Sequence, residues 1–223
     1  MSDSSPQDTQ PRSGTWRLVN GLFSSRPRSV SSDTLHEVYR ITLLAPERIP
    51  ELARQSLVLF VNAGLAFAVL DAVVRLVRPV APFLSGDAAL LHLVLLIALN
   101  GLAYVAVLGV HEGLHAVTIL AQGGRPTFGL KLPFALYCTA PNQLFRRNGY
   151  RVVALAPLVV ITVLGVVVTV LAPNLGAYLW LAWVGNVSGA VGDLVAARAL
   201  ANVPPSALIA DTEDGFIAYT REQ

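Results

Sequence analysis

Four long apolar blocks constrain this chain more than any other feature of its sequence. They run over about residues 56–77, 88–120, 152–172 and 175–200. Each can cross a hydrocarbon core about 30 Å thick as a helix, for which roughly 20 apolar residues suffice. A helix satisfies its own backbone hydrogen bonds in lipid, and no block alternates like a barrel strand. We therefore predict an all-α membrane protein with about four transmembrane helices.

The composition agrees with a membrane protein and excludes other classes. Charged residues make up 13% of the chain and hydrophobic residues 54%, whereas about a quarter of the residues in a soluble domain are charged. The net charge of +2 is too small to indicate a nucleic-acid partner. Cys138 is the single cysteine, which excludes an internal disulfide framework and a multi-cysteine zinc site.

The two ends of the chain differ from the apolar blocks. Residues 1–33 are rich in Ser, Pro and Arg and are predicted to be a disordered polar tail, followed by a membrane-embedded domain over 34–223. β-branched and aromatic residues favour a strand over 36–43. Residues 207–210 and 216–219, in the segment 203–223, favour a hairpin around a polar turn. We expect these segments to form a small cytoplasmic β element.

The basic residues predict the orientation in the membrane. Arginines concentrate in the N-terminal segment, and Arg and Lys recur between the second and third blocks. Because cytoplasmic loops carry an excess of Lys and Arg, both termini and this middle loop are expected in the cytoplasm. The chain is thus predicted to be a multi-pass protein of the cell membrane.

One motif carries catalytic chemistry: His111-Glu112-Gly113-Leu114-His115, an H-E-x-x-H match at the end of the second apolar block. Two histidines at i and i+4 lie about 40° apart around a helix, so both imidazoles can bind one ion. Zn²⁺ lowers the pKa of a bound water to about 7, and Glu112 is placed to act as the general base. We therefore predict a Zn²⁺ site with His111 and His115 as ligands and Glu112 as a catalytic residue.

A zinc site with two histidines needs a third protein ligand. The sequence contains no histidine after His115 and no glutamate between Glu112 and Glu213. Asp193, the one carboxylate of the last two blocks, is therefore the predicted third ligand. The alternative is a carboxylate at a helix end that pairs with Arg198.

Asn186 precedes Asp193 by seven residues and so lies on nearly the same helix face. Its side-chain amide is a candidate donor to the oxyanion that develops during hydrolysis. The spacing of Gly185 and Gly189 allows another helix to approach this face closely. Asn186 is therefore a predicted catalytic residue, and an ordinary interhelical amide is the alternative.

The H-E-x-x-H motif on a membrane helix, followed by a later helix that contains Gly192-Asp193, resembles the site-2 protease type of intramembrane metalloprotease. The sequence is also similar to a family of small membrane proteins labelled zincin peptidases, over about residues 38–219. Tyr137-Cys138-Thr139-Ala140-Pro141 and Ala154-Leu155-Ala156-Pro157-Leu158 contribute to this likeness. Site-2 proteases carry Leu-Asp-Gly as their second motif, whereas this chain has Gly192-Asp193-Leu194. The resemblance implies a membrane-embedded zinc protease.

Two further features bear on a protease. Pro157 lies inside the third block and is expected to kink that helix. Residues 128–137 have period-two apolar character, typical of a strand that could hold an extended substrate by strand addition. A surface loop between two spans is the alternative for this segment.

These observations favour a membrane-embedded zinc metalloprotease. Its substrates are expected to be membrane proteins or membrane-proximal proteins, with the lipid bilayer as the surrounding phase. The alternative function is a non-proteolytic metal-binding membrane scaffold, which needs the histidines but not Glu112. A transporter is disfavoured because the chain has no inverted repeat and few polar intramembrane positions.

Overall fold

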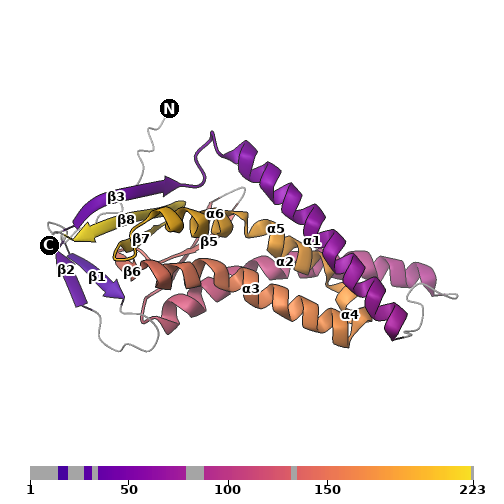
Figure 1. The fold of residues 1–223 in the computed structure, drawn as a ribbon. Helices are drawn as coiled ribbons and strands as arrows, with labels where there is room; N and C mark the ends of the chain where they lie inside the picture. Colours follow the sequence, from indigo (N-terminus) through magenta and orange to yellow (C-terminus); the bar gives the residue numbers. More distant parts are fainter. Residues whose placement is uncertain (1–14, 20–27, 32–34, 79–87, 132–134, 222–223) are drawn as a thin grey trace. The chain divides into compact units, whose positions relative to one another are not determined.

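The computed structural model describes residues 15–19, 28–31, 35–78, 88–131 and 135–221 (Figure 1). The chain divides into two compact units, each made of separate stretches of sequence. The sheet unit comprises Met1–Pro46, His115–Ala154 and Val195–Gln223, and the helical unit comprises Glu47–Leu114 and Leu155–Leu194. Three helices begin in one unit and end in the other: α2 (Ala89–Ala121), α3 (Arg147–Leu171) and α6 (Val191–Ala199).

Three helices are long and apolar enough to cross a membrane: α1 (Ile49–Val77), α2 (Ala89–Ala121) and α3 (Arg147–Leu171). Many of their large apolar side chains are exposed, among them Leu57, Leu102 and Val163. Phe67, Ile161 and Trp183 belong to the buried apolar core of the helical unit. Side chains that are apolar on both the inner and the outer face of a helix are typical of helices surrounded by lipid. The predicted spans over 56–77, 88–120 and 152–172 are thus long apolar helices.

The fourth apolar block is not one long helix, so this part of the prediction is wrong. It forms α4 (Pro173–Tyr178), α5 (Trp180–Gly189) and α6 (Val191–Ala199). Leu179 and Ala190 separate these helices, with ψ of 9° and 12° instead of the −42° typical of an α-helix. Glycines recur along this block, and glycine is the weakest helix former after proline. The interruption at Ala190 lies between Asn186 and Asp193.

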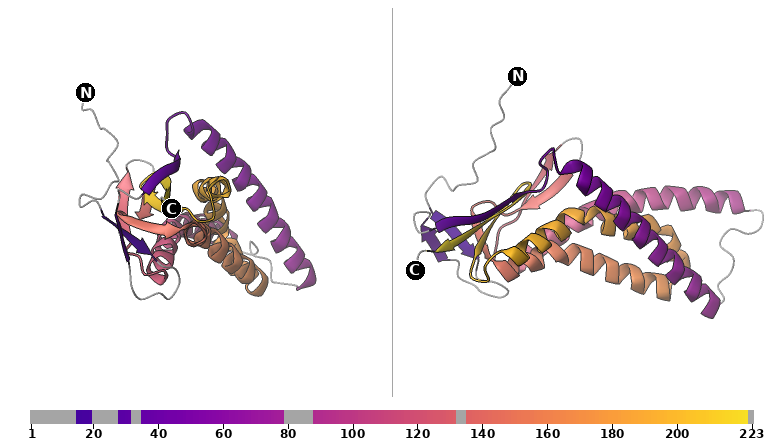
Figure 2. Two further views of the ribbon diagram at one scale, coloured as in Figure 1. Left: turned by 60° about the vertical axis from the view of Figure 1, so that its left-hand side comes forward. Right: turned by 45° about the horizontal axis from the view of Figure 1, so that its top comes forward.

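A mixed sheet of six strands forms in the sheet unit, in the order β2-β1-β6-β7-β8-β3 (Figure 2). Its strands are β1 (Thr15–Val19), β2 (Arg28–Ser31), β3 (Leu35–Thr42), β6 (Gln143–Arg146), β7 (Leu208–Thr212) and β8 (Gly215–Arg221). β1 pairs in parallel with β6, and the other neighbours are antiparallel. The fold is therefore mostly helical but not all-α, which corrects the predicted fold class.

The predicted strand over 36–43 and the predicted C-terminal hairpin are confirmed. In the hairpin of β7 and β8, Leu208 lies opposite Tyr219 at one end and Thr212 lies opposite Gly215 at the other. β3 pairs with β8 at the edge of the sheet. β1 and β2 lie in the segment predicted to be a disordered tail, so that prediction is wrong for these two strands. The physical reason is burial: Trp16 and Val19 are only 3% and 2% exposed in the core of this unit.

A second, two-stranded sheet lies between α2 and β6 along the chain. β4 (Thr127–Lys131) pairs in antiparallel fashion with β5 (Ala135–Thr139), and residues 132–134 between them lie outside the described residues. The period-two character of 128–137 therefore does correspond to strands.

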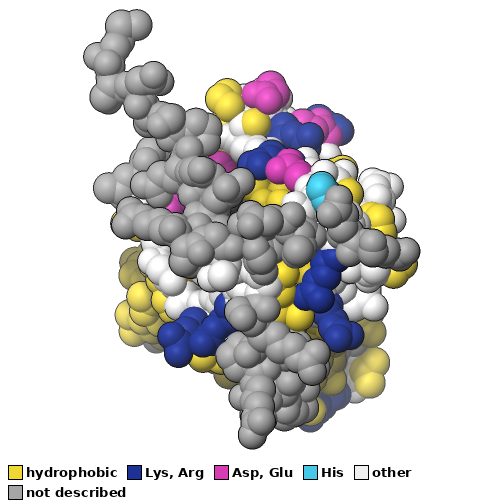
Figure 3. All heavy atoms as spheres, turned by 90° about the vertical axis from the view of Figure 1, so that its left-hand side faces the viewer, with side chains coloured by type: hydrophobic (Ala, Val, Ile, Leu, Met, Phe, Trp, Pro, Cys, Tyr) yellow, Lys and Arg dark blue, Asp and Glu magenta, His cyan; other side chains and the backbone are white. Residues whose placement is uncertain are grey.

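Figure 3 shows one face of the molecule, on which acidic and basic side chains gather near the top and basic side chains alone lie lower down.

Candidate metal centre

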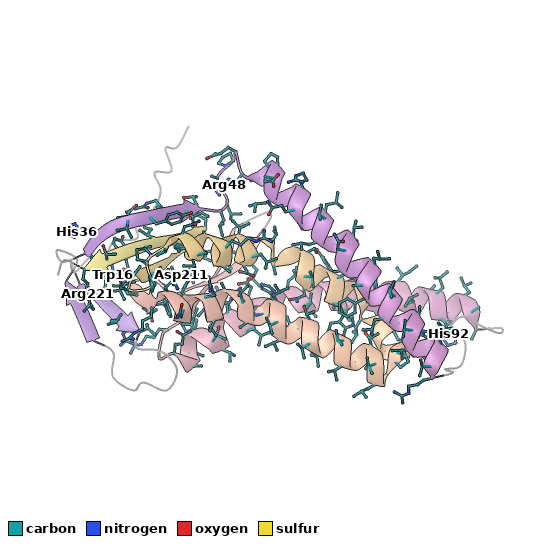
Figure 4. All side chains as sticks on the ribbon, in the orientation of Figure 1. Trp16, His36, Arg48, His92, Asp211 and Arg221 are labelled. Carbon is teal, nitrogen blue, oxygen red and sulfur yellow. The ribbon has the colours of Figure 1, made fainter. Side chains whose placement is uncertain are left out.

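The H-E-x-x-H motif lies on α2, where one helical turn brings its side chains together. The possible ligand atoms of His111, Glu112 and His115 all lie within 4.8 Å of one another. The His111 side chain is 12% exposed and His115 is 8% exposed, so little water reaches either imidazole. His92 is near the start of the same helix (Figure 4), about 28 Å from His111 along the axis, and cannot share this site.

Both ring nitrogens of His111 meet an oxygen from the helices that follow α3. Nδ1 lies 3.0 Å from Oδ1 of Asn186 on α5, and Nε2 lies 3.0 Å from Oδ2 of Asp193 on α6. The two predicted residues therefore contact the same imidazole, one at each nitrogen. The break at Ala190 between α5 and α6 separates these two contacts along the chain.

The surroundings of Asn186 determine which His111 nitrogen carries a proton. The amide nitrogen of Asn186 lies 3.5 Å from the carbonyl oxygen of Leu158 and 3.4 Å from Oγ1 of Thr162. A carbonyl can only accept, so the amide nitrogen must face Leu158 and the amide oxygen must face His111. It follows that Nδ1 of His111 donates a proton to Asn186.

This assignment leaves Nε2 of His111 directed at the Asp193 carboxylate. Two acceptors 3.0 Å apart repel each other unless a proton or a metal cation lies between them. Two ligand atoms of a tetrahedral zinc ion, each about 2.05 Å from the metal, are about 3.3 Å apart. The observed separation is close to that value, and the donor set of imidazole and carboxylate is one that zinc prefers. The residues present therefore fit a zinc ion.

His115 is oriented in the same way by a different partner. Its Nδ1 lies 2.9 Å from the backbone carbonyl oxygen of Val153 on α3, and because that oxygen only accepts, Nδ1 donates. A neutral histidine that donates through Nδ1 carries its lone pair on Nε2, the nitrogen that a metal ion would bind. Both histidines of the motif therefore have the tautomer expected of Nε2 ligands.

The Tyr104 side chain of α2 lies against the backbone of α5 at Gly185, next to Asn186. A Cβ atom on Gly185 would lie 2.5 Å from the aromatic ring of Tyr104, so the ring occupies the place of a side chain there. At Gly189, by contrast, a Cβ would have no neighbour within 4 Å in the described part of the chain. Of these two glycines, Gly185 is thus the one at which the absence of a side chain makes room for another helix's residue.

Asp211 on β7 is a functional candidate that the sequence did not identify. Its carboxylate accepts from the Tyr150 hydroxyl at 2.7 Å and from the Ala140 backbone N–H at 2.9 Å, inside the sheet unit (Figure 4). Burial raises the pKa of Asp211, although its hydrogen bonds with Tyr150, Thr139 and Ala140 and the nearby His115 act in the opposite direction. This carboxylate therefore lies within electrostatic reach of the motif.

The geometry supports the roles predicted for Asp193 and Asn186 to different degrees. Asp193 and His111 are in direct contact, as a shared metal would require. Asn186 is 2% exposed and its amide oxygen faces His111, so the geometry favours orienting the imidazole over contacting substrate. Its role as an oxyanion donor stays a prediction.

Asp71 and Arg75 lie on α1 and do not belong to this site. Their side chains form an ion pair with an N–O distance of 2.7 Å.

A helix-borne His-Glu-His group with oriented imidazoles defines a zincin-like centre. A family model described as “Putative zincin peptidase” matches residues 104–208, a segment that contains the motif, Asn186 and Asp193. Over this segment the chain is similar to that family, and the resemblance to zincin peptidases noted in the sequence is confirmed. No curated protein and no solved structure matches the chain.

Proposed function

We propose that this protein is a membrane-embedded zinc metalloprotease that hydrolyses peptide bonds of membrane-associated proteins. The observation that carries the proposal is the paired orientation of the motif histidines, each of which donates through Nδ1 to a fixed acceptor. The family match and the three long apolar helices support it. His111, His115 and Asp193 are the proposed metal ligands.

The proposed chemistry follows from the residues around the motif. A bound Zn²⁺ would lower the pKa of water and polarise the peptide carbonyl. Glu112 would take a proton from the attacking water and pass it to the departing amide nitrogen. Asn186 and the Val153 carbonyl would hold the two imidazoles in place throughout.

The β4–β5 hairpin is the proposed site for an extended substrate. Phe128, Leu130 and Leu136 are 56%, 62% and 42% exposed, so the hairpin presents an apolar surface. Asp211 binds the Ala140 N–H, directly after β5, and also interacts electrostatically with His115. One end of the hairpin is thereby tied to the residues near the motif. Strand addition along β4 would present one substrate carbonyl to the site.

A helical substrate must open before cleavage because its carbonyls are hydrogen-bonded along the chain. Gly or Pro placed near the cleaved bond of a test substrate should therefore raise turnover. Leu130→Pro removes a backbone donor from β4 and should lower turnover while zinc is retained. If folded Leu130→Pro protein cleaves at the wild-type rate, strand addition is wrong.

Metal analysis of the purified full-length protein tests the proposed function. We expect one Zn²⁺ per chain, lost in His111→Ala and His115→Ala and largely retained in Glu112→Gln. Cells with Glu112→Gln protein should accumulate the uncleaved substrates that wild-type cells process. Stoichiometric zinc after removal of both histidines would contradict the site. Zinc binding with identical substrate levels in wild-type and Glu112→Gln cells would favour the scaffold.

A further inference from the structure

A proline inside α3 coincides with the backbone carbonyl that holds His115. Pro157 lies in the middle of a 25-residue helix and is fully buried. Proline in a helix interior costs about 3 kcal/mol because it removes one hydrogen bond and its ring crowds the carbonyl four residues earlier. The residue four positions before Pro157 is Val153.

The missing hydrogen bond and the His115 contact therefore involve the same oxygen atom. In a regular helix the N–H of residue 157 would donate to the carbonyl of Val153. Proline has no N–H, and the Val153 oxygen instead lies 2.9 Å from Nδ1 of His115. Val153 is 5% exposed and His115 is 8% exposed, so water does not readily replace either partner. A buried carbonyl without a partner is costly, and the imidazole N–H removes that cost.

We infer that Pro157 is a positioning residue for the metal centre. It withholds the helical donor from the Val153 carbonyl, which then accepts from Nδ1 of His115 and leaves Nε2 of His115 for the metal. The inference rests on the proposed zinc site and adds a residue that touches neither metal nor substrate. The inference also connects the predicted kink to the site. The proline ring crowds the Val153 carbonyl and turns it away from the helix axis, toward His115.

Pro157→Ala restores the N–H and so offers Val153 its helical partner. We expect zinc affinity, measured by competition with a chelator on full-length protein in detergent, to fall about 10- to 100-fold, as is typical when a metal ligand loses its orienting partner. The thermal midpoint of the metal-free protein should stay equal or rise, because a helical hydrogen bond is gained. Pro173→Ala is the matched control, since Pro173 lies at the first turn of α4, where no donor is needed. It should bind zinc like the wild type.

Two further measurements isolate the N–H itself. Lactic acid in place of Pro157 lacks both the ring and the N–H, and it should restore zinc affinity to within about threefold of wild type. In the metal-free protein, ¹⁵N NMR of the His115 ring should show Nδ1 protonated in wild type and in the lactic acid variant, and a loss of that tautomer in Pro157→Ala.

The outcomes separate this inference from the proposed function. Wild-type affinity in Pro157→Ala would overturn the inference, and so would equal losses in the alanine and lactic acid variants. A wild-type protein that binds no zinc would contradict the proposed function instead. The tautomer of His115 in the metal-free variants would still decide the role of Pro157.

Discussion

Replacing Gly185 by alanine tests whether the approach of α5 to α2 builds the metal centre. The new Cβ would lie 2.5 Å from the Tyr104 ring, whereas carbon atoms in contact are about 3.5–4.0 Å apart. The helix or the ring must therefore move by about 1 Å. Asn186 is the next residue, so a shift of the helix by this distance would lengthen its 3.0 Å contact with His111 beyond hydrogen-bonding distance.

Two effects should follow from this overpacking. Overpacking a packed interior costs about 1–3 kcal/mol, and because the Tyr104 ring is 41% exposed, we expect the free energy of unfolding to fall by the lower end of that range, about 1 kcal/mol. Zinc affinity should fall about 10- to 100-fold because His111 loses its orienting partner. Thermal unfolding of the metal-free protein and chelator competition measure the two effects separately.

Gly189→Ala is the matched control, because the same methyl group meets no atom of the described residues within 4 Å there. It should leave both quantities unchanged. Tyr104→Ala should restore zinc affinity to Gly185→Ala protein, since the ring that clashes is gone. The reasoning is refuted if Gly185→Ala binds zinc like wild type, or if both glycine variants lose affinity equally.

Three further predictions concern the carboxylates and the topology. Asp193→Ala should weaken zinc binding by more than about tenfold because Asp193 contacts His111, whereas Asp214→Ala should not weaken it. If Asp193→Ala and wild-type protein have equal zinc affinities in a chelator competition, Asp193 is not a ligand. Since burial raises the pKa of Asp211, its contribution to stability is full below the pKa of an unfolded aspartate, about 3.9, and is lost as the pH rises through the raised pKa. The thermal midpoint of metal-free wild-type protein should fall over this pH range, and that of Asp211→Asn should not. Identical pH profiles for the two proteins would contradict the raised pKa of Asp211. Reporter fusions after Gln223 and within residues 79–86 should report opposite sides of the membrane, and the same side for both would reject the predicted orientation.

The features that the sequence predicted correctly depend on local periodicity. The four-residue spacing of His111 and His115 places both imidazoles on one helical turn whatever the rest of the chain does. The apolar lengths of α1, α2 and α3 follow from composition alone. The β-branched and aromatic residues of β3 and the polar turn between β7 and β8 likewise belong to short segments.

Other features depend on contacts that no local pattern encodes. The fourth apolar block has the length of a span, yet it breaks at Leu179 and Ala190. β1 has a polar, unstructured-looking context, and its strand forms because β6, more than a hundred residues later, pairs with it. Secondary structure that forms only through such long-range pairing has no sequence signal of its own.

The orientation of the proposed metal ligands shows most clearly which features are local and which are tertiary. The sequence by itself determined which side chains can bind zinc, because residue type and helical spacing are local properties. Only the tertiary structure decided how they are held: Asn186 is 75 residues from His111, and the Val153 carbonyl is 38 residues from His115. A backbone carbonyl has the same chemistry at every position, so sequence alone cannot single it out. Pro157 is the local sequence feature that marks the Val153 carbonyl, because a proline leaves the carbonyl four residues earlier without its helical donor. Only the structure shows that the His115 imidazole lies opposite this carbonyl.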